Sequence, residues 1–441
     1  MFSRKDLMRL IIPLIIEQIL AVTVGMADGI MVARVGEAAV SGVSLVDSIS
    51  VLLIGLFSAL ATGGAVVAAQ FLGHKQKENA SLAAEQLIVV TFAISMLIMA
   101  FALLFRLSLL KLIFGHVEAD VMENAITYFF WSALSYPFLA LYNAGAALFR
   151  SMGNSKISMF TSLIMNLINV TGNAILIFGF SMGVAGAAIA TLIARVFAAI
   201  AIMILLANNK GDIRIGSFRM FRLNKIIIKK ILQIGIPNGL ENSVFQVGKI
   251  IVLGIVAKLG TAATAANSVA GTVGSFGVLP GSAIGLALIT VVGQLVGARD
   301  YEGVKYYTKK LMKVVYIIMA GINIVIALLS PLIVQIYGFS AETGDIMMQL
   351  ILYHCTLAAL IWPTSFALPN ALRAANDVKF TMIISIVSMF TWRIGFSIVL
   401  VNFTSLGVLG VWIAMSIDWL FRSICFIVRF KREKYKTLSL I

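Results

Sequence analysis

A carboxylate lies inside a long apolar run near the start of the chain. Asp28 belongs to the segment "GMADGIMVARVG" at residues 25–36, which follows "LIIPLIIEQILAVTV". Glu17 precedes Asp28 by eleven residues, about three helical turns, so the two acids share one face of a helix. An aspartate within a membrane costs about 2.5 to 3.5 kcal/mol and is by default a functional hypothesis. We expect this face to line protein or a water-filled cavity, because lipid would not solvate it.

Three asparagines recur on one helix face further along the chain. Asn166, Asn169 and Asn173 follow the spacing i, i+3, i+7 in "SLIMNLINVTGNAILIF", which places them on one side of a helix. Their side-chain oxygens, together with one carboxylate, could replace the water shell of a small cation. They could equally form hydrogen bonds that join neighbouring helices. The residues alone leave both interpretations open.

Other ionisable side chains also fall in or beside apolar stretches. Asp47 precedes an apolar stretch, where the N-terminus of a helix would favour an acid as a cap. Asp418 and Arg422 are four residues apart and could pair on one helix face. The remaining ionisable residues in such stretches are Arg195, Glu241, Lys249 and Arg393.

The composition makes lipid the solvent for most of the chain. Of its 441 residues 60% are hydrophobic and 12% charged, and the mean hydropathy is +1.01, whereas a soluble domain carries about 25% charged residues. No small-residue cleavage site follows the basic start, so we expect a retained first helix. The pattern predicts an all-α membrane protein with twelve transmembrane helices, at 8–33, 45–72, 82–105, 124–149, 157–180, 184–207, 231–257, 270–297, 314–337, 346–372, 380–401 and 406–428.

The positive charges are distributed unevenly between the two sides of these spans. The formal charge is +15, and 26 of the 34 Lys and Arg residues fall on one side and four on the other. This asymmetry is typical of the positive-inside rule. It predicts a multi-pass protein of the cell membrane with both termini in the cytoplasm. The excess charge is therefore a topology signal and not evidence of nucleic-acid binding.

The two halves of the chain repeat one design. At an offset of 224 residues, Pro13 matches Pro237, Glu17 matches Glu241 and Gly36 matches Gly260; an offset held along most of each half indicates an internal repeat. Six spans per half make the repeats parallel, and transporters with such halves place the substrate site between or within them. We predict two six-helix lobes around a central cavity: an N-lobe at 1–206, a basic cytoplasmic linker at 207–230, a C-lobe at 231–430 and a cytoplasmic tail at 431–441.

Several segments resemble one family of transporters over essentially the whole chain. They are "ADGIMVARVG", "AAQFLGHKQ", "AALFRSMGNSKISM", "GVAGAAIATLIAR", "VVGQLVGARD" and "NALRAANDVKF". In this order and spacing they resemble the MATE family, the multidrug and toxic compound extrusion transporters. The resemblance implies export of small amphipathic, often cationic compounds by alternating access, in antiport with Na⁺ or H⁺ and without another cofactor or a partner protein.

The resemblance also assigns roles to particular residues. The family's cation site falls on Asp28, Asn169, Asn173 and Thr191, although some members carry an aspartate where this chain has Asn173. Certain branches use further acids in the seventh and tenth spans, but residues 346–376 contain no acid, which argues against that second site. Residues that could line a substrate cavity are Glu17, Asn166, Glu241, Gln246 and Lys249.

Two alternative functions follow from other features of the sequence. A flippase for lipid-linked oligosaccharides would need cations for a pyrophosphate, and Arg195, Lys249 and Arg393 could supply them. A membrane-embedded enzyme would need a nucleophile with a base, or a metal set, and the chain contains no G-x-S-x-G or H-E-x-x-H motif. We therefore expect a transporter and not an enzyme. The sequence does not identify the exported compound, because such cavities recognise size, apolarity and charge.

Overall fold

A computed structural model describes residues 2–115, 117–208, 211–216 and 222–438. Parts of the predicted linker (209–210 and 217–221) and the last three residues of the predicted tail lie outside the described residues. Two of the basic residues that contribute to the predicted orientation, Lys210 and Arg219, are among them. The described chain contains helices and no strands, as the composition predicts.

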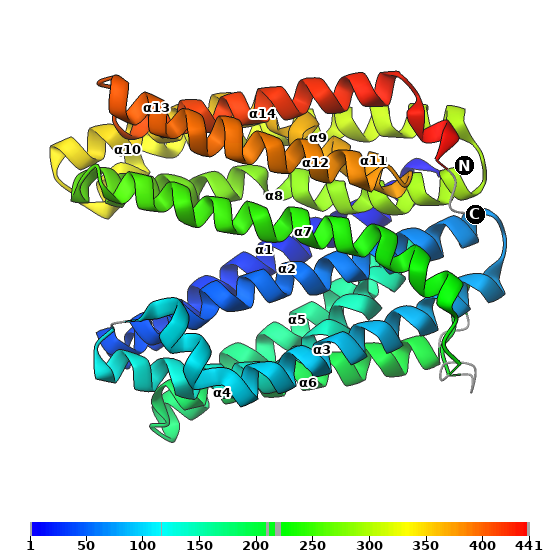
Figure 1. The fold of residues 1–441 in the computed structure, drawn as a ribbon, viewed down its shortest axis with the longest axis horizontal. Helices are drawn as coiled ribbons and strands as arrows, with labels where there is room; N and C mark the ends of the chain where they lie inside the picture. The colour runs from blue at the N-terminus through cyan, green and yellow to red at the C-terminus, as the bar shows by residue number, and fades with distance from the viewer. Residues whose placement is uncertain (1, 116, 209–210, 217–221, 439–441) are drawn as a thin grey trace. The chain divides into compact units, whose positions relative to one another are not determined.

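Most helices follow one another with short connections (Figure 1), whereas residues 208–224 separate α6 from α7. From the N-terminus they are α1 (Arg4–Ala33), α2 (Glu37–Gly73), α3 (Lys77–Phe114), α4 (Ala119–Ser151), α5 (Ser155–Asn173), the π-helical turn η1 (Ala174–Gly179), α6 (Gly183–Ala207) and α7 (Lys225–Ala257). They continue with α8 (Thr261–Gly297), α9 (Tyr301–Tyr337), α10 (Ala341–Leu360), the π-helical turn η3 (Pro363–Ala367), α11 (Leu368–Ala374), α12 (Val378–Ser388), the π-helical turn η4 (Met389–Gly395), α13 (Phe396–Phe403), α14 (Val408–Lys431) and the 3₁₀ turn η5 (Lys434–Thr437).

Each of the twelve predicted spans coincides with one helical segment. The tenth is bent by 59° between α10 and η3–α11, next to Pro363, and the fifth and eleventh each contain a π-helical turn. Ten described helices are long and apolar enough to cross a membrane, or eleven if the bent pair is one span. The helix outside this count is α4, which packs against α2, α3 and α6. Since protein surrounds α4, it carries buried polar residues such as Ser135 and Tyr136.

The backbone repeats at the offset that the sequence predicts. Gly36 and Gly260 have φ of 145° and 100°, and Gly183 and Gly407 have φ of 55° and 54°. These positions begin α2, α8, α6 and α14, where a positive φ favours glycine because a Cβ would clash with the backbone. The same turns therefore connect equivalent helices in both halves, which supports one duplicated fold.

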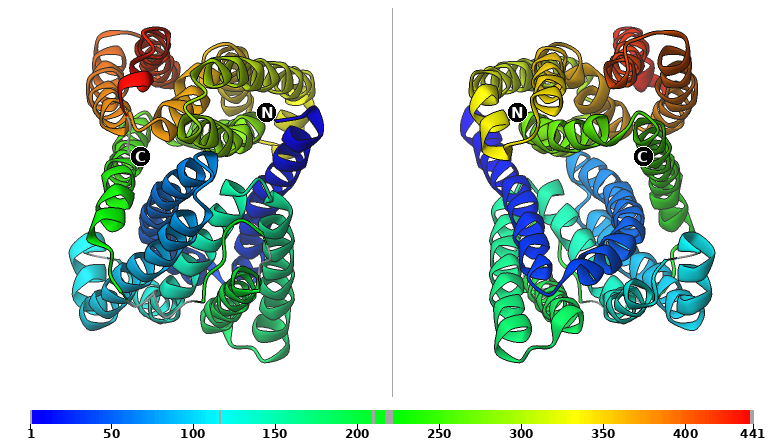
Figure 2. Two further views of the ribbon diagram at one scale, coloured as in Figure 1. Left: turned by 90° about the vertical axis from the view of Figure 1, so that its right-hand side faces the viewer. Right: turned by 90° about the vertical axis from the view of Figure 1, so that its left-hand side faces the viewer.

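The chain forms two compact units by its internal contacts, Phe2–Gly239 and Leu240–Ile441, with the boundary inside α7. We call them the first and the second unit; the lobe boundaries drawn from the sequence stay a prediction. Within each unit the helices run alongside one another, as Figure 2 shows in views largely along their axes. In the first unit α4 contacts α2, α3, α5 and α6, and in the second α8 contacts α9, α10 and α11.

Candidate cation site and substrate cavity

The four residues of the predicted cation site lie together in the first unit. The Asn173 amide donates a hydrogen bond of 2.6 Å to Oδ1 of Asp28. The Asn169 amide lies between Asp28 and Thr191, 2.7 Å from Oδ1 of Asp28 and 3.0 Å from Oγ1 of Thr191. Helices α1, α5 and α6 thus each contribute to one cluster of oxygen-bearing side chains.

The close approach of α5 and α6 explains how this cluster forms. A Cβ on Gly172 would lie 3.0 Å from the Cβ of Ala190, so a larger residue would push the two helices apart. Gly172 precedes Asn173, and Ala190 precedes Thr191. The π-helical turn η1 begins directly after Asn173, and such turns occur frequently at functional sites.

One oxygen of the cluster has no hydrogen-bond donor. Oδ1 of Asn173 is buried without a partner among the described atoms, and the residue is only 1% exposed. A buried acceptor without a donor costs free energy, and a cation would satisfy it. The Asn169 amide satisfies both neighbours when its nitrogen faces Asp28, and turning the amide over would present its oxygen to a cation there, because the two ends of an amide have the same shape. The residues present therefore fit a small cation held by oxygen ligands.

A second acid and one base lie close to Asp28. Arg195 interacts electrostatically with both Asp28 and Asp47, and its Nη1 donates a hydrogen bond of 2.7 Å to Oγ of Ser135. The interpretation of Asp47 as a helix cap is wrong, because α2 begins at Glu37 and places Asp47 almost three turns inside the helix.

Glu17 and Glu241, equivalent in the repeat, are both held in buried ion pairs. Oε1 of Glu17 lies 3.3 Å from Nη1 of Arg150, and its Oε2 accepts a hydrogen bond of 2.9 Å from Ser158. Oε1 of Glu241 lies 2.7 Å from Nη2 of Arg373 and accepts a hydrogen bond of 2.6 Å from Ser385. This shared geometry joins α1 to α4 and α5, and α7 to α11 and α12, which indicates a positioning role for both acids.

The expected pair between Asp418 and Arg422 does not form. Asp418 instead pairs with Arg393, with 3.5 Å between Oδ2 and Nη1, and it accepts a 2.5 Å hydrogen bond from Ser388. Arg422 lies 3.6 Å from Oε1 of Glu241. Tertiary neighbours thus replace the partner on the same helix, because they bring charges from other helices within reach of both side chains.

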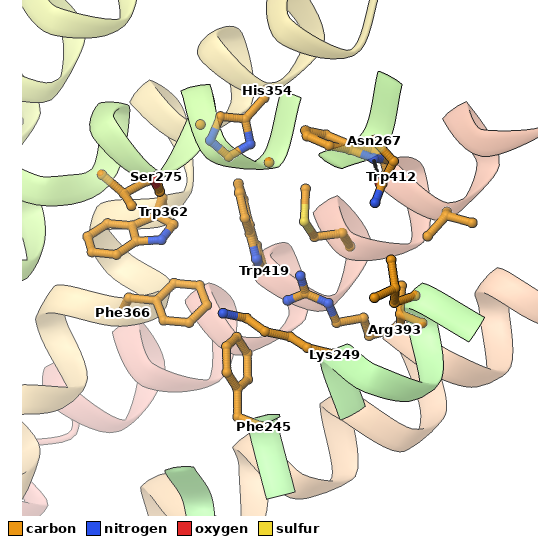
Figure 3. A pocket seen from close by; sticks show the side chains of 17 residues that line it. Phe245, Lys249, Asn267, Ser275, His354, Trp362, Phe366, Arg393, Trp412 and Trp419 are labelled. Atoms are coloured by element: carbon orange, nitrogen blue, oxygen red, sulfur yellow. Dashed lines mark hydrogen bonds between the residues drawn. The ribbon is translucent and has the colours of Figure 1, made fainter. Parts of the chain in front are cut away.

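The second unit contains a cavity of about 500 Å³ between α7, α8, α10, η3, η4 and α14. Figure 3 shows Lys249 and Arg393 reaching into it, with Phe245 on one side and Trp419 on the other. Lys249 is the one predicted cavity residue in its lining. Glu241 and Gln246 belong to α7 but not to the lining. Glu17 and Asn166 belong to the first unit, where Asn166 is buried and its amide lies 3.5 Å from Oγ of Ser162.

Sequence reasoning missed the aromatic side chains of this cavity. Trp362, Phe366, Trp412 and Trp419 line it, but they come from two separate segments, at η3 and on α14, that show no common motif. Three of the five tryptophans of the chain gather here. Tryptophan is rare in the chain, and this rarity was the sequence feature that could have pointed to these residues.

The sequence model of the MatE family matches the chain twice, at residues 13–175 and 237–399. The two matches lie 224 residues apart, which is the offset of the internal repeat. Together they cover most of the chain.

Curated relatives match over nearly their whole length. The "Uncharacterized transporter YisQ" of Bacillus subtilis is 29% identical, over 92% of this chain and 89% of its own. The "Probable multidrug resistance protein NorM" of Thermotoga maritima is 26% identical, over 99% and 94%. Among solved structures, an outward-facing multidrug resistance MATE family transporter has a TM-score of 0.92 at 22% identity, covering 98% of this chain and 96% of that chain. A MATE structure in a bent conformation has a TM-score of 0.89 at 23% identity, covering 99% and 96%.

Proposed function

Because this chain belongs to the MatE family of multidrug transporters, we propose that it exports small amphipathic compounds by alternating access, driven by Na⁺ that enters at Asp28. One observation carries the choice of site: a buried, donor-free oxygen of Asn173 next to the Asp28 carboxylate. A proton would need only the carboxylate, whereas Na⁺ also uses the neutral oxygens of Asn169, Asn173 and Thr191. H⁺ as the coupling ion is therefore the alternative outcome of the test below.

The chemistry of coupling follows from charge. Without a cation, Asp28 and Asp47 face one arginine, Arg195, so the cluster carries net negative charge. A bound cation neutralises this charge and gives the Asn173 oxygen a partner, which changes the hydrogen bonds between α1, α5 and α6. Moving one charge down 100 mV releases about 2.3 kcal/mol. This free energy supports coupling between ion entry and the rearrangement that releases the compound.

The two alternative functions gain little support. The flippase hypothesis rested on Arg195, Lys249 and Arg393 as cations for a pyrophosphate. Arg195, however, belongs to the acidic cluster of the first unit, and the Thermotoga maritima relative is named a probable multidrug resistance protein. An enzyme would need a catalytic set, and family members are transporters.

The orientation with both termini in the cytoplasm also belongs to this proposal and is supported by the uneven distribution of Lys and Arg.

The test is export by the purified full-length protein in vesicles under separately imposed Na⁺ and H⁺ gradients. Two dyes serve as probes, ethidium as an amphipathic cation and a naphthalene sulfonate as an amphipathic anion. We expect a Na⁺ gradient to drive export of at least one dye, and Asp28→Asn to reduce the rate about tenfold or more, since a charge-assisted contact contributes about 1.5 to 3 kcal/mol.

Asp120→Asn is the matched control, because Asp120 is exposed in the first turn of α4 and lies outside the site. It should export at the rate of the unaltered protein. Undiminished gradient-driven export by Asp28→Asn would refute the proposed coupling site. Export driven by H⁺ alone would keep Asp28 but replace Na⁺ as the coupling ion.

A further inference from the structure

The cavity of the second unit concentrates positive charge. Nζ of Lys249 lies 5.1 Å from the centre of the Phe245 ring, and Cζ of Arg393 lies 5.3 Å from the same centre. A cation within about 6 Å of an aromatic ring is attracted by it. Arg422 also lies near this ring, with Cζ 5.8 Å from its centre. Three cationic groups therefore surround one aromatic side chain.

The nearby carboxylates do not balance these cations. Glu241 is engaged by Arg373 and Arg422, and Asp418 is engaged by Arg393. These two acids therefore face three arginines before Lys249 is counted. Within the described second unit Lys249 forms no ion pair, and the lining of the cavity contains no carboxylate.

Buried donors in the lining also lack an acceptor. Nε of Arg393 and Nε1 of Trp419 have no hydrogen-bond partner among the described atoms. Arg393 is 8% exposed and Trp419 is 3% exposed. A buried donor without a partner costs free energy, and a ligand that carries acceptor oxygens would remove that cost for both.

The walls of the cavity are aromatic. The rings of Trp362 and Phe366 are stacked with 5.1 Å between their centres, and Phe366 meets Trp419 edge-on at 6.0 Å. Aromatic rings pair favourably with other rings in offset or edge-to-face arrangements. A volume of about 500 Å³ falls within the range of drug-sized ligand sites, roughly 300 to 1,000 Å³. A lipid-linked oligosaccharide is larger than this cavity, whereas a compound with one or two rings fits it.

We propose that this cavity binds small aromatic anions, with Lys249 and Arg393 holding the carboxylate or sulfonate and Phe366 and the tryptophans holding the ring. The inference rests on the proposed function, since it names a class of exported compound. The cluster around Asp28 in the first unit has the opposite balance of charge, because the two acids Asp28 and Asp47 outnumber Arg195 there. Under the repeat, Asp28 and Thr191 correspond to Val252 and Met415, so the second unit lacks the oxygens of the cation site.

The test is equilibrium binding to the full-length protein in detergent, without any ion gradient. Radiolabelled 1-naphthoate and 1-naphthylmethylammonium, which share a ring system but carry opposite charges, are compared in a scintillation proximity assay. We expect the naphthoate to bind at least about tenfold more tightly than the ammonium compound. Lys249→Gln should weaken naphthoate binding by about tenfold, the effect of losing a charge-assisted contact, and leave the ammonium compound unaffected or bound more tightly.

Lys258→Gln is the matched control, because Lys258 directly follows α7 outside the cavity; it should bind naphthoate as the unaltered protein does. If the unaltered protein binds the ammonium compound as tightly as naphthoate, or more tightly, the proposal is overturned. This comparison of two ligands uses the unaltered protein and does not depend on whether a variant folds. Unchanged naphthoate affinity in folded Lys249→Gln overturns the proposal as well, because the naphthoate would then be bound at another site or taken up by the detergent. Since no gradient is applied, failure here is distinguishable from failure of Na⁺ coupling at Asp28.

Discussion

The Asn173 side chain places its amide nitrogen 2.6 Å from the Asp28 carboxylate and leaves its own oxygen buried without a donor. One amide thus joins the end of α5 to α1, and its oxygen stays available as a cation ligand beside the negative charge of Asp28. A protein that only needed to hold these helices together would gain from satisfying both ends of that amide. The relationship therefore indicates a site that a cation completes, and the first two predictions follow from it.

Replacing Asn173 by aspartate should make the stability of the protein depend on cations. The variant Asn173→Asp places a second carboxylate against Asp28, and two like charges in contact repel each other strongly away from water. We expect its unfolding temperature at neutral pH to be lower in choline chloride and to rise by several degrees in NaCl, more than for the unaltered protein. Asn173→Ala controls for the loss of the amide. Identical shifts in both salts for Asn173→Asp would contradict a cation site here.

Replacing Thr191 by valine removes one proposed Na⁺ ligand while keeping the shape of the side chain. We expect Thr191→Val to raise the Na⁺ concentration for half-maximal export by about tenfold, since the hydroxyl oxygen no longer faces the ion. The maximal rate should change much less. Export assays over a range of Na⁺ concentrations measure both quantities. An unchanged Na⁺ dependence would remove Thr191 from the ligand set, and Thr23→Val, on the exposed part of α1, controls for loss of a threonine hydroxyl.

Neutralising Glu241, a buried acid of the second unit, should destabilise the protein strongly. Glu241→Gln leaves Arg373 and Arg422 without their carboxylate, and breaking a buried pair costs about 3 to 5 kcal/mol. Glu17→Gln should cost less, because its pair with Arg150 is longer and the Arg150 side chain is 16% exposed. The double variant Glu241→Gln/Arg373→Met should recover part of the loss. Unfolding in detergent measures the stability of the unaltered protein, the two single variants and the double variant. Equal losses of stability for Glu241→Gln and Glu17→Gln would contradict this ranking.

Widening the contact between α7 and η4 should disrupt the anion cavity. A Cβ on Gly248 would lie 2.5 Å from Sδ and 2.7 Å from Cγ of Met389, which is only 1% exposed and has little room to turn away. We therefore expect Gly248→Val to displace Met389 together with η4 and to move Arg393 from Lys249. We expect naphthoate to bind several-fold more weakly to this variant. Adding Met389→Ala removes the clash and should restore most of the affinity. A double variant as weak as Gly248→Val alone would show that this contact does not position the two cations.

The sequence by itself determined the membrane-spanning helices and their duplication. Runs of apolar residues with helical length identify spans because lipid cannot satisfy an exposed backbone, and all twelve predicted spans coincide with helical segments. The offset between Pro13 and Pro237 also survives in the backbone, since turns of positive φ recur at Gly36 and Gly260. Asp28 and the asparagine face were visible because polar groups are expensive in such segments.

Only the tertiary structure decided which charges meet. Asp418 pairs with Arg393 instead of with Arg422 on its own helix, and Lys249 and Arg393 share the ring of Phe245 although they lie on different helices. Spacing along one helix predicts contacts on that helix, but it carries no information on which faces of distant helices pack together. The packing of glycines such as Gly248 against side chains from far along the chain settles that question, and with it the sign of the charge that each site can accept.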